Sequence, residues 1–206
     1  MPRDGKQIRV RLQWAALELF RKRGYEETTA AEIAAKAGVT ERTFFRHFSD
    51  KRDVLFDGEA EFTKALTAAV RNAPADLGPW DVLSNALLSV KQMFIENRPF
   101  TEPRQGVIAA TPALQERAMA KTRSLVAAVT SALCERGLGS AQANLVAWMG
   151  VATMSYAVAA WFNDSSIDLG EHIIGAFREA TQLSQPDAAK LKVKERRISQ
   201  KKDQSR

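Results

Sequence analysis

The chain has 206 residues, of which 45% are hydrophobic, and its 30 basic and 24 acidic side chains give a net charge of +6. This length is enough for one small and one medium domain with a sizeable core. The single cysteine, Cys134, excludes an internal disulfide, and two histidines are too few for a convincing metal site. We therefore expect no metal and no cofactor. Residues 1–11 are charged, so no signal peptide is expected either.

The positive charge lies toward the two ends of the chain. Residues 1–56 carry 12 basic and 8 acidic side chains, residues 57–186 are mildly acidic, and residues 187–206 have a net charge of +5. A basic first domain fits a phosphate-rich partner, because neutralising phosphates releases counterions. On charge alone, a merely solvated surface explains it equally well. Residues 186–206 lack sustained apolar periodicity and are expected to be a disordered or only partly helical tail that either attracts DNA or aids solubility.

The first predicted helix has apolar residues three and four positions apart, from Ile8 through Leu12 to Phe20, and Gly24 is placed to end it. The segment Thr29-Ala-Ala-Glu32 then has the pattern of a capping box, which predicts a short second helix. Gly38 stops that helix, and Thr40 can cap a third helix that covers residues 41–47.

The turn between the second and third helices spans only residues 37–40, so the two helices must cross steeply, as in a helix-turn-helix. Phe44 and Phe48 lie one turn apart and are expected to point inward, which leaves most of the third helix facing outward. Asp50 can cap a fourth helix. The third helix is therefore a candidate for insertion into the major groove of DNA.

The rest of the chain is helical in pattern. We expect a break at residues 72–79, a helix over 80–97, a second break at Arg98-Pro99-Phe100 and a short helix opened by Pro103. Thr111-Pro112 begins a helix that ends near Gly137. Further helices are expected from Ser140 to about 162 and, capped by Asp168, to about 183. The fold class is therefore all-α, with about nine helices.

Residues 137–163 contain no charged side chain, and a run of that length could span a bilayer. The run is rich in Ala and Gly and includes Gln142 and Asn144, so a buried helix of a large soluble domain explains it better. We expect no membrane partner. A helix that is apolar all round needs cover on more than one side. One side can face the core of its own domain, and the other can meet a second subunit.

Residues 7–56 resemble the DNA-binding domain of the TetR family of bacterial transcriptional regulators. The resemblance rests on the Leu19-Phe20 pair before Gly24-Tyr25, on Ala37-Gly38-Val39, on the run from Thr43 to Phe48 and on Lys51. Two positions depart from the pattern. Phe45 stands where tyrosine is common, so it can offer only an apolar contact such as one to a thymine methyl. Ala31 replaces a polar or basic residue.

The resemblance implies a DNA-binding domain over 1–56 and an effector-binding and dimerisation domain over 57–185. Thr29 and Lys51 would hold phosphates, while Arg42, Thr43 and Arg46 would approach base edges. Thr40 and Glu41, at the start of the recognition helix, could contact either phosphates or bases. Phe45 and His47 complete the surface. A dimer would bind the two half-sites of a near-palindromic operator.

The family also dimerises through its last two long helices. The expected seam consists of small residues of the uncharged helix and apolar residues of the last one: Ala143, Ala147, Gly150, Ala157, Ile173, Ile174 and Phe177. An effector pocket would be lined by large, adaptable side chains: Trp80, Met93, Phe94, Phe100, Trp148, Met149, Met154 and Trp161. Core packing is the alternative for any one of them. A loose likeness to an acyl-CoA-responsive subgroup would place Arg104 at the pocket mouth, although a surface arginine is the default interpretation.

These observations predict a cytoplasmic, ligand-responsive repressor that a hydrophobic small molecule releases from its operator, with a fatty acyl-CoA as one candidate. An activator, or a DNA-binding protein without a ligand, is the alternative. An all-α enzyme is a remote one, because the chain has no phosphate-binding loop, no G-x-S-x-G and no H-E-x-x-H motif.

Overall fold

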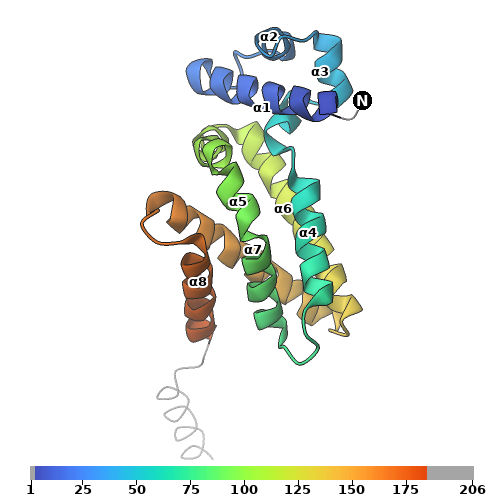
Figure 1. Ribbon diagram of the computed structural model, residues 1–206, viewed down its shortest axis with the longest axis vertical. Helices are drawn as coiled ribbons and strands as arrows, with labels where there is room; N and C mark the ends of the chain where they lie inside the picture. Colours follow the sequence, from blue (N-terminus) through green and yellow to red (C-terminus); the bar gives the residue numbers. More distant parts are fainter. Residues whose placement is uncertain (1–2, 185–206) are drawn as a thin grey trace, which may run out of the picture. The chain divides into compact units, whose positions relative to one another are not determined.

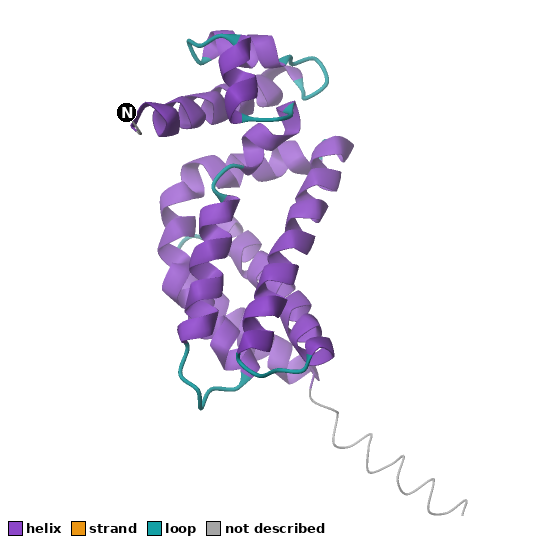
Figure 2. Cartoon of the chain, turned by 90° about the vertical axis from the view of Figure 1, so that its right-hand side faces the viewer, coloured by secondary structure: helices purple, strands orange, loops and turns teal. Residues whose placement is uncertain are grey.

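The computed structural model describes residues 3–184, which are helical apart from short connections (Figure 1, Figure 2). The elements in this range are α1 (Arg3–Arg23), α2 (Ala30–Lys36), α3 (Glu41–His47), the 3-10 helix η1 (Lys51–Phe56), α4 (Glu59–Asn72), α5 (Pro79–Ala109), α6 (Pro112–Glu135), α7 (Ser140–Asn163) and α8 (Leu169–Ser184). The expected all-α fold with nine helices is confirmed for the described residues. The predicted disordered tail lies outside them.

The first three helices and η1 enclose a compact core. Leu12 of α1, Ile33 of α2 and Phe44 of α3 are each 0% exposed. Gly24 ends α1 in the left-handed conformation, with φ +85°, as the sequence indicated. The same core takes in Phe100 of α5 and Leu114 of α6. It therefore extends past residue 56, which is where the DNA-binding domain was predicted to end.

Helices α4, α5 and α6 pack against one another below this core (Figure 1). Leu66 and Val70 of α4 are buried, as are Leu83 of α5 and Leu133 of α6. The three helices follow from their sequences, since each buries an apolar stripe at helical spacing.

One sequence prediction about α5 is wrong. A break was expected at residues 98–100, followed by a separate helix opened by Pro103, but α5 continues through Pro99 and Pro103 to Ala109. Each proline removes a backbone donor and crowds the preceding turn, at a cost of ~3 kcal/mol. Packing offsets that cost, because Phe100 and Val107 are each 8% exposed on the side of α5 that joins the core.

Contacts divide the described residues into two compact units, and the division falls inside α7, between Ala152 and Thr153. In the second unit, Asp168 Oδ1 accepts a hydrogen bond of 2.8 Å from the Gly170 amide at the start of α8, in agreement with the predicted cap.

Helix α7 is long and apolar enough to cross a membrane by length and composition, with a mean hydropathy of 1.5. A core helix of a soluble protein meets the same criterion.

A candidate nucleic-acid interface

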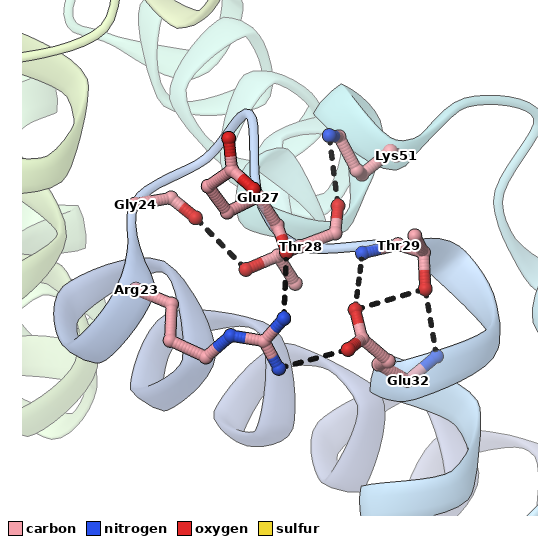
Figure 3. A network of polar contacts seen from close by, with 7 residues as sticks. All are labelled: Arg23, Gly24, Glu27, Thr28, Thr29, Glu32 and Lys51. Atoms are coloured by element: carbon pink, nitrogen blue, oxygen red, sulfur yellow. Dashed lines mark hydrogen bonds and ion pairs between the residues drawn. The ribbon is translucent and has the colours of Figure 1, made fainter.

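The start of α2 is fixed by the predicted capping box. The Thr29 hydroxyl accepts a hydrogen bond of 3.2 Å from the Glu32 amide, and Glu32 Oε2 accepts one of 2.9 Å from the Thr29 amide (Figure 3). These bonds satisfy two amides that would otherwise lack partners at the helix start. They also hold the pKa of Glu32 at about 2, chiefly through the Thr29 amide, with a contribution from the Arg23 guanidinium.

The loop between α1 and α2 is held by further polar contacts. Arg23 donates from Nη1 to Glu32 Oε1 at 2.8 Å and from Nη2 to the Glu27 carbonyl at 2.9 Å, while the Thr28 hydroxyl donates to the Gly24 carbonyl at 2.8 Å (Figure 3). The loop therefore presents Thr29 in a fixed position, although the Thr29 hydroxyl already serves as the cap.

Lys51 closes the same loop from the other side. Its ammonium donates to the carbonyls of Tyr25 and Thr28, both at 2.8 Å, and lies 3.9 Å from the centroid of the Tyr25 ring. Figure 3 shows Lys51 reaching from η1 toward Thr28. An ammonium has three donors, so these two bonds leave one for a phosphate. Lys51 thus has a structural role that its predicted phosphate contact did not include.

Helix α3 separates its buried and exposed residues as the sequence predicted. Phe44 is 0% exposed and Phe48 is 4% exposed, whereas Phe45 is 52% exposed. Arg42 and Arg46 are exposed one turn apart, which places two guanidinium groups on one face of the helix. Glu41 is exposed beside them. The Thr40 hydroxyl caps the helix by accepting a hydrogen bond of 3.2 Å from the Thr43 amide.

His47 is placed differently from the rest of the predicted surface. It is half-buried, close to Gly5 of α1, and its Nε2 has no hydrogen-bond partner among the described residues. Burial lowers the pKa of His47, and the nearby Arg9 and Arg46 lower it further. The imidazole is therefore neutral at pH 7 and contributes no positive charge to a DNA-binding surface.

A group of charged contacts that the sequence did not reveal joins η1 and the start of α4 to other helices. Arg104 of α5 donates to the Leu55 carbonyl at 2.7 Å, and Arg117 of α6 pairs with Asp53 at 2.5 Å. Lys121 pairs with Glu59 at 3.3 Å, although burial still raises the pKa of Glu59. The partners lie 49 or more residues apart in sequence, and local periodicity carries no signal for such pairs.

The predicted effector residues are spread over different environments. Phe100 packs in the core next to the helix-turn-helix, where its ring meets that of Trp14 edge-on at a centroid distance of 5.5 Å. Arg104 is hydrogen-bonded to the Leu55 carbonyl. Phe94 is half-buried and contacts the Phe62 ring at 5.0 Å. Trp80 and Met93 are also half-buried, Trp148 and Met149 are exposed, and Met154 and Trp161 are buried.

Most of the predicted seam residues are covered within the single chain. A Cβ on Gly150 would overlap Leu83 Cδ1, so this glycine permits close packing of α7 on α5. Ile174 is the exception, at 38% exposed. The covered residues are Ala143, Ala147, Gly150, Ala157, Ile173 and Phe177. They are unavailable to a second subunit in this conformation.

The exposed side of α7 carries large apolar side chains instead. Leu145 and Tyr156 are each 60% exposed, and Trp148 is 40% exposed. Their spacing of three, eight and eleven residues places them on one side of the helix.

Among residues 3–184 there is no group of three or more His, Cys, Asp or Glu side chains that could hold a metal ion.

Two short helices joined by a tight turn, with a basic exposed face on the second, define a helix-turn-helix DNA-binding protein. Comparison with known proteins agrees. Residues 14–57 match the family model for bacterial regulatory proteins of the tetR family, and residues 77–183 match the model for the MftR C-terminal domain. The chain belongs to the TetR family of bacterial transcriptional regulators.

Individual relatives match over different lengths. The regulator TcmR of Streptomyces glaucescens is 39% identical over 85 residues, which are 41% of this chain and 38% of TcmR. A protein of Mycobacterium tuberculosis named as a mycofactocin biosynthesis transcriptional regulator, MftR, is 27% identical over 79% of this chain and 83% of its own length. A crystal structure of Thermus thermophilus FadR with lauroyl-CoA superposes with a TM-score of 0.53 and 26% identity, covering 86% of this chain and 95% of that one.

Proposed function

We propose that this TetR-family regulator is a cytoplasmic repressor that binds a near-palindromic operator as a dimer and leaves it when a hydrophobic small molecule binds. The exposed face of α3 carries this proposal, because Arg42, Phe45 and Arg46 project from a helix whose opposite side is anchored by buried Phe44 and Phe48. Such a rigid base is needed if side chains are to discriminate between bases.

The contacts divide by their chemistry. Arg42 and Arg46 can each form bidentate hydrogen bonds with a guanine edge, at ~1–3 kcal/mol of discrimination per pair. Phe45 would contact a thymine methyl, and Thr43 would hydrogen-bond a neighbouring base. The third donor of Lys51 would contact a phosphate and set the register. Thr29 at the start of α2 would contact a second phosphate by exchanging one of the hydrogen bonds that its amide and hydroxyl donate to Glu32 Oε2. Thr40 and Glu41 stand at the start of α3, where either kind of contact is open to them.

Dimerisation is assigned to α7 and α8, as the family resemblance implies. The apolar residues that remain exposed on α7 support a seam on that side, formed by Leu145, Trp148 and Tyr156. On α8, Ile174 is exposed in the same way. Burying such side chains contributes about 25 cal/mol for each Å² removed from water. The seam is thus proposed on the face opposite the small residues that the sequence suggested.

The effector is proposed to be a fatty acyl-CoA. The lauroyl-CoA in the T. thermophilus FadR structure supports this class of ligand, and half-buried Met93 and Phe94 offer apolar contact within the larger domain. An effector weakens operator binding only by the difference between its affinities for the two conformations.

The test begins with selection of duplexes from a random library by the full-length protein. A near-palindromic sequence should be enriched, and Arg46→Ala should weaken its binding by about tenfold or more at fixed salt, with unchanged thermal stability. Arg123→Ala, an exposed arginine of α6, is the control and should bind like the wild type. Equal affinity for selected and scrambled duplexes would refute operator recognition.

The effector is tested separately with lauroyl-CoA and with coenzyme A alone. Lauroyl-CoA should release the protein from the selected operator at micromolar concentration, roughly −8 kcal/mol of binding, whereas coenzyme A alone should not. Phe94→Ala should shift the lauroyl-CoA response more than it shifts operator affinity without ligand. An absent response across a series of acyl chain lengths would exclude acyl-CoA and leave the DNA-binding proposal standing.

A further inference from the structure

The outer side of α1 carries a hollow that plays no part in the proposed contact with DNA. It has a volume of about 460 Å³ and is lined by Trp14, Leu17, Glu18, Arg21 and Lys22. These residues are three and four positions apart, so they form one continuous stripe along the helix. The opposite side of α1 faces the core.

One wall of the hollow is apolar and aromatic. Trp14 is 45% exposed, and its ring meets the buried Phe100 ring of α5 edge-on at a centroid distance of 5.5 Å and an angle of 74°. Leu17, at 2% exposed, lies beside it. The contact with Phe100 fixes the indole in place, so the exposed part of the ring is a preformed surface. The exposed part of such a ring offers apolar contact to a ligand.

The other wall is cationic. Glu18, the one carboxylate of the lining, is neutralised by Lys36 of α2, whose Nζ lies 2.7 Å from Glu18 Oε1. Arg21 and Lys22 have no ion pair or hydrogen bond to any side chain in the described range. Two uncompensated positive charges therefore border the aromatic wall, about two helical turns along α1 from Trp14.

We propose that this hollow is a binding site for a small organic anion with a flat apolar body, such as an aromatic carboxylate or sulfonate. Its volume falls in the range of about 300–1,000 Å³ that is usual for small-molecule sites. Trp14 and Leu17 contact the apolar body, and Arg21 and Lys22 attract the anionic group. The hollow contains neither Met93 nor Phe94, the residues to which the proposed function assigns contact with the effector, and binding to it is measurable without DNA.

The test uses 2-naphthalenesulfonate and its neutral analogue 2-naphthalenesulfonamide as probes. The full-length protein is labelled with ¹⁵N-tryptophan, and the indole N–H signals of its four tryptophans are followed by NMR, with Trp14→Phe used to assign the Trp14 signal. The sulfonate should move the Trp14 signal in a saturable way, with a dissociation constant about tenfold lower than that of the sulfonamide. Raising the salt concentration should weaken the binding of the sulfonate and leave that of the neutral sulfonamide unchanged.

The charge requirement is tested with the double variant Arg21→Gln/Lys22→Gln. Its matched control is Lys6→Gln/Arg11→Gln, which removes the same charge from exposed positions of the same helix. The first variant should bind the sulfonate about tenfold more weakly, and the control should bind like the wild type. The proposal fails if the Trp14 signal does not move, if only the other indole signals move, if both probes bind equally, or if the two double variants behave alike.

Discussion

Arg104 of α5 donates a hydrogen bond of 2.7 Å to the backbone carbonyl of Leu55 in η1. Leu55 lies only eight residues after the end of α3, so the larger domain is tied directly to the element that follows the recognition helix. Burial lowers the pKa of the Arg104 guanidinium, with Glu59 acting in the opposite direction. The side chain expected at the mouth of an effector pocket therefore joins two parts of the fold.

Replacing Arg104 tests this connection. Arg104→Met keeps the aliphatic stem but removes the donor, so the buried Leu55 carbonyl loses its side-chain partner. We expect the free energy of unfolding to fall by about 1.5–3 kcal/mol, the usual range for a hydrogen bond to a charged group. Urea denaturation measures the change. Arg123→Met on the exposed side of α6 should stay within about 0.5 kcal/mol of the wild type, and an equal loss in both variants would contradict the assignment.

Two adjacent phenylalanines of α3 are expected to respond in opposite ways. Phe44→Ala removes a side chain that is 0% exposed and should lower the free energy of unfolding by about 3–5 kcal/mol. Phe45→Ala removes one that is 52% exposed, so it should change stability much less and instead weaken binding to the selected operator. Denaturation and gel-shift titration on both variants decide the matter. Similar stability losses for the two would show that Phe45 serves the core.

The capping box gives a pH dependence with a definite sign. The folded-state pKa of Glu32 is about 2, below its ordinary value of 4.5. The stability that this carboxylate provides is therefore fully present above pH 4.5 and is lost as the pH falls toward 2. The melting temperature of Glu32→Gln should lie below that of the wild type at pH 7, and the difference should shrink as the pH falls below 4.5 and vanish only at about pH 2 and below. The control Glu26→Gln, in the exposed loop before α2, should have the melting temperature of the wild type at pH 7.

Lys51 is expected to affect both folding and DNA binding. Lys51→Met loses the bonds to the Tyr25 and Thr28 carbonyls, so its melting temperature should fall. It should also weaken binding to all duplexes by a similar factor and make the salt dependence of log K shallower by ~1, as expected for one lost phosphate contact. Lys64→Met, exposed on α4, should do neither. A loss confined to one base position would instead assign Lys51 to base recognition.

Features set by neighbouring residues could be predicted from the sequence. The capping box of Thr29 and Glu32 and the inward placement of Phe44 and Phe48 depend on spacings of three and four residues, which any helix imposes. The continuous α5 could not be predicted in this way. Local propensity ends a helix at Pro99, and only the burial of Phe100 and Val107 by distant residues shows why the helix continues.

The same distinction explains the site residues. A small residue such as Gly150 indicates that something packs closely, but the sequence does not say whether the neighbour is a second subunit or, as here, Leu83 of the same chain. Likewise, the charged contacts of Arg104 and Arg117 join residues 49 and 64 positions away. Without the fold, both arginines read as ordinary surface side chains.

The proposed dimer seam is tested on the exposed side of α7. Leu145 is 60% exposed, so a charged side chain there can stay hydrated in a monomer, whereas a seam would bury the charge without a partner at a cost of several kcal/mol. Leu145→Arg should therefore shift the protein from dimer to monomer in sedimentation velocity while retaining its helical circular dichroism. Met119→Arg, on an equally apolar residue of α6 that is 57% exposed, should remain dimeric. Gly150→Arg, by contrast, should lower the free energy of unfolding, because it places a charge at a buried position against Leu83, and so reports on the core. If Leu145→Arg sediments as a dimer of wild-type stability, the seam does not include this face of α7.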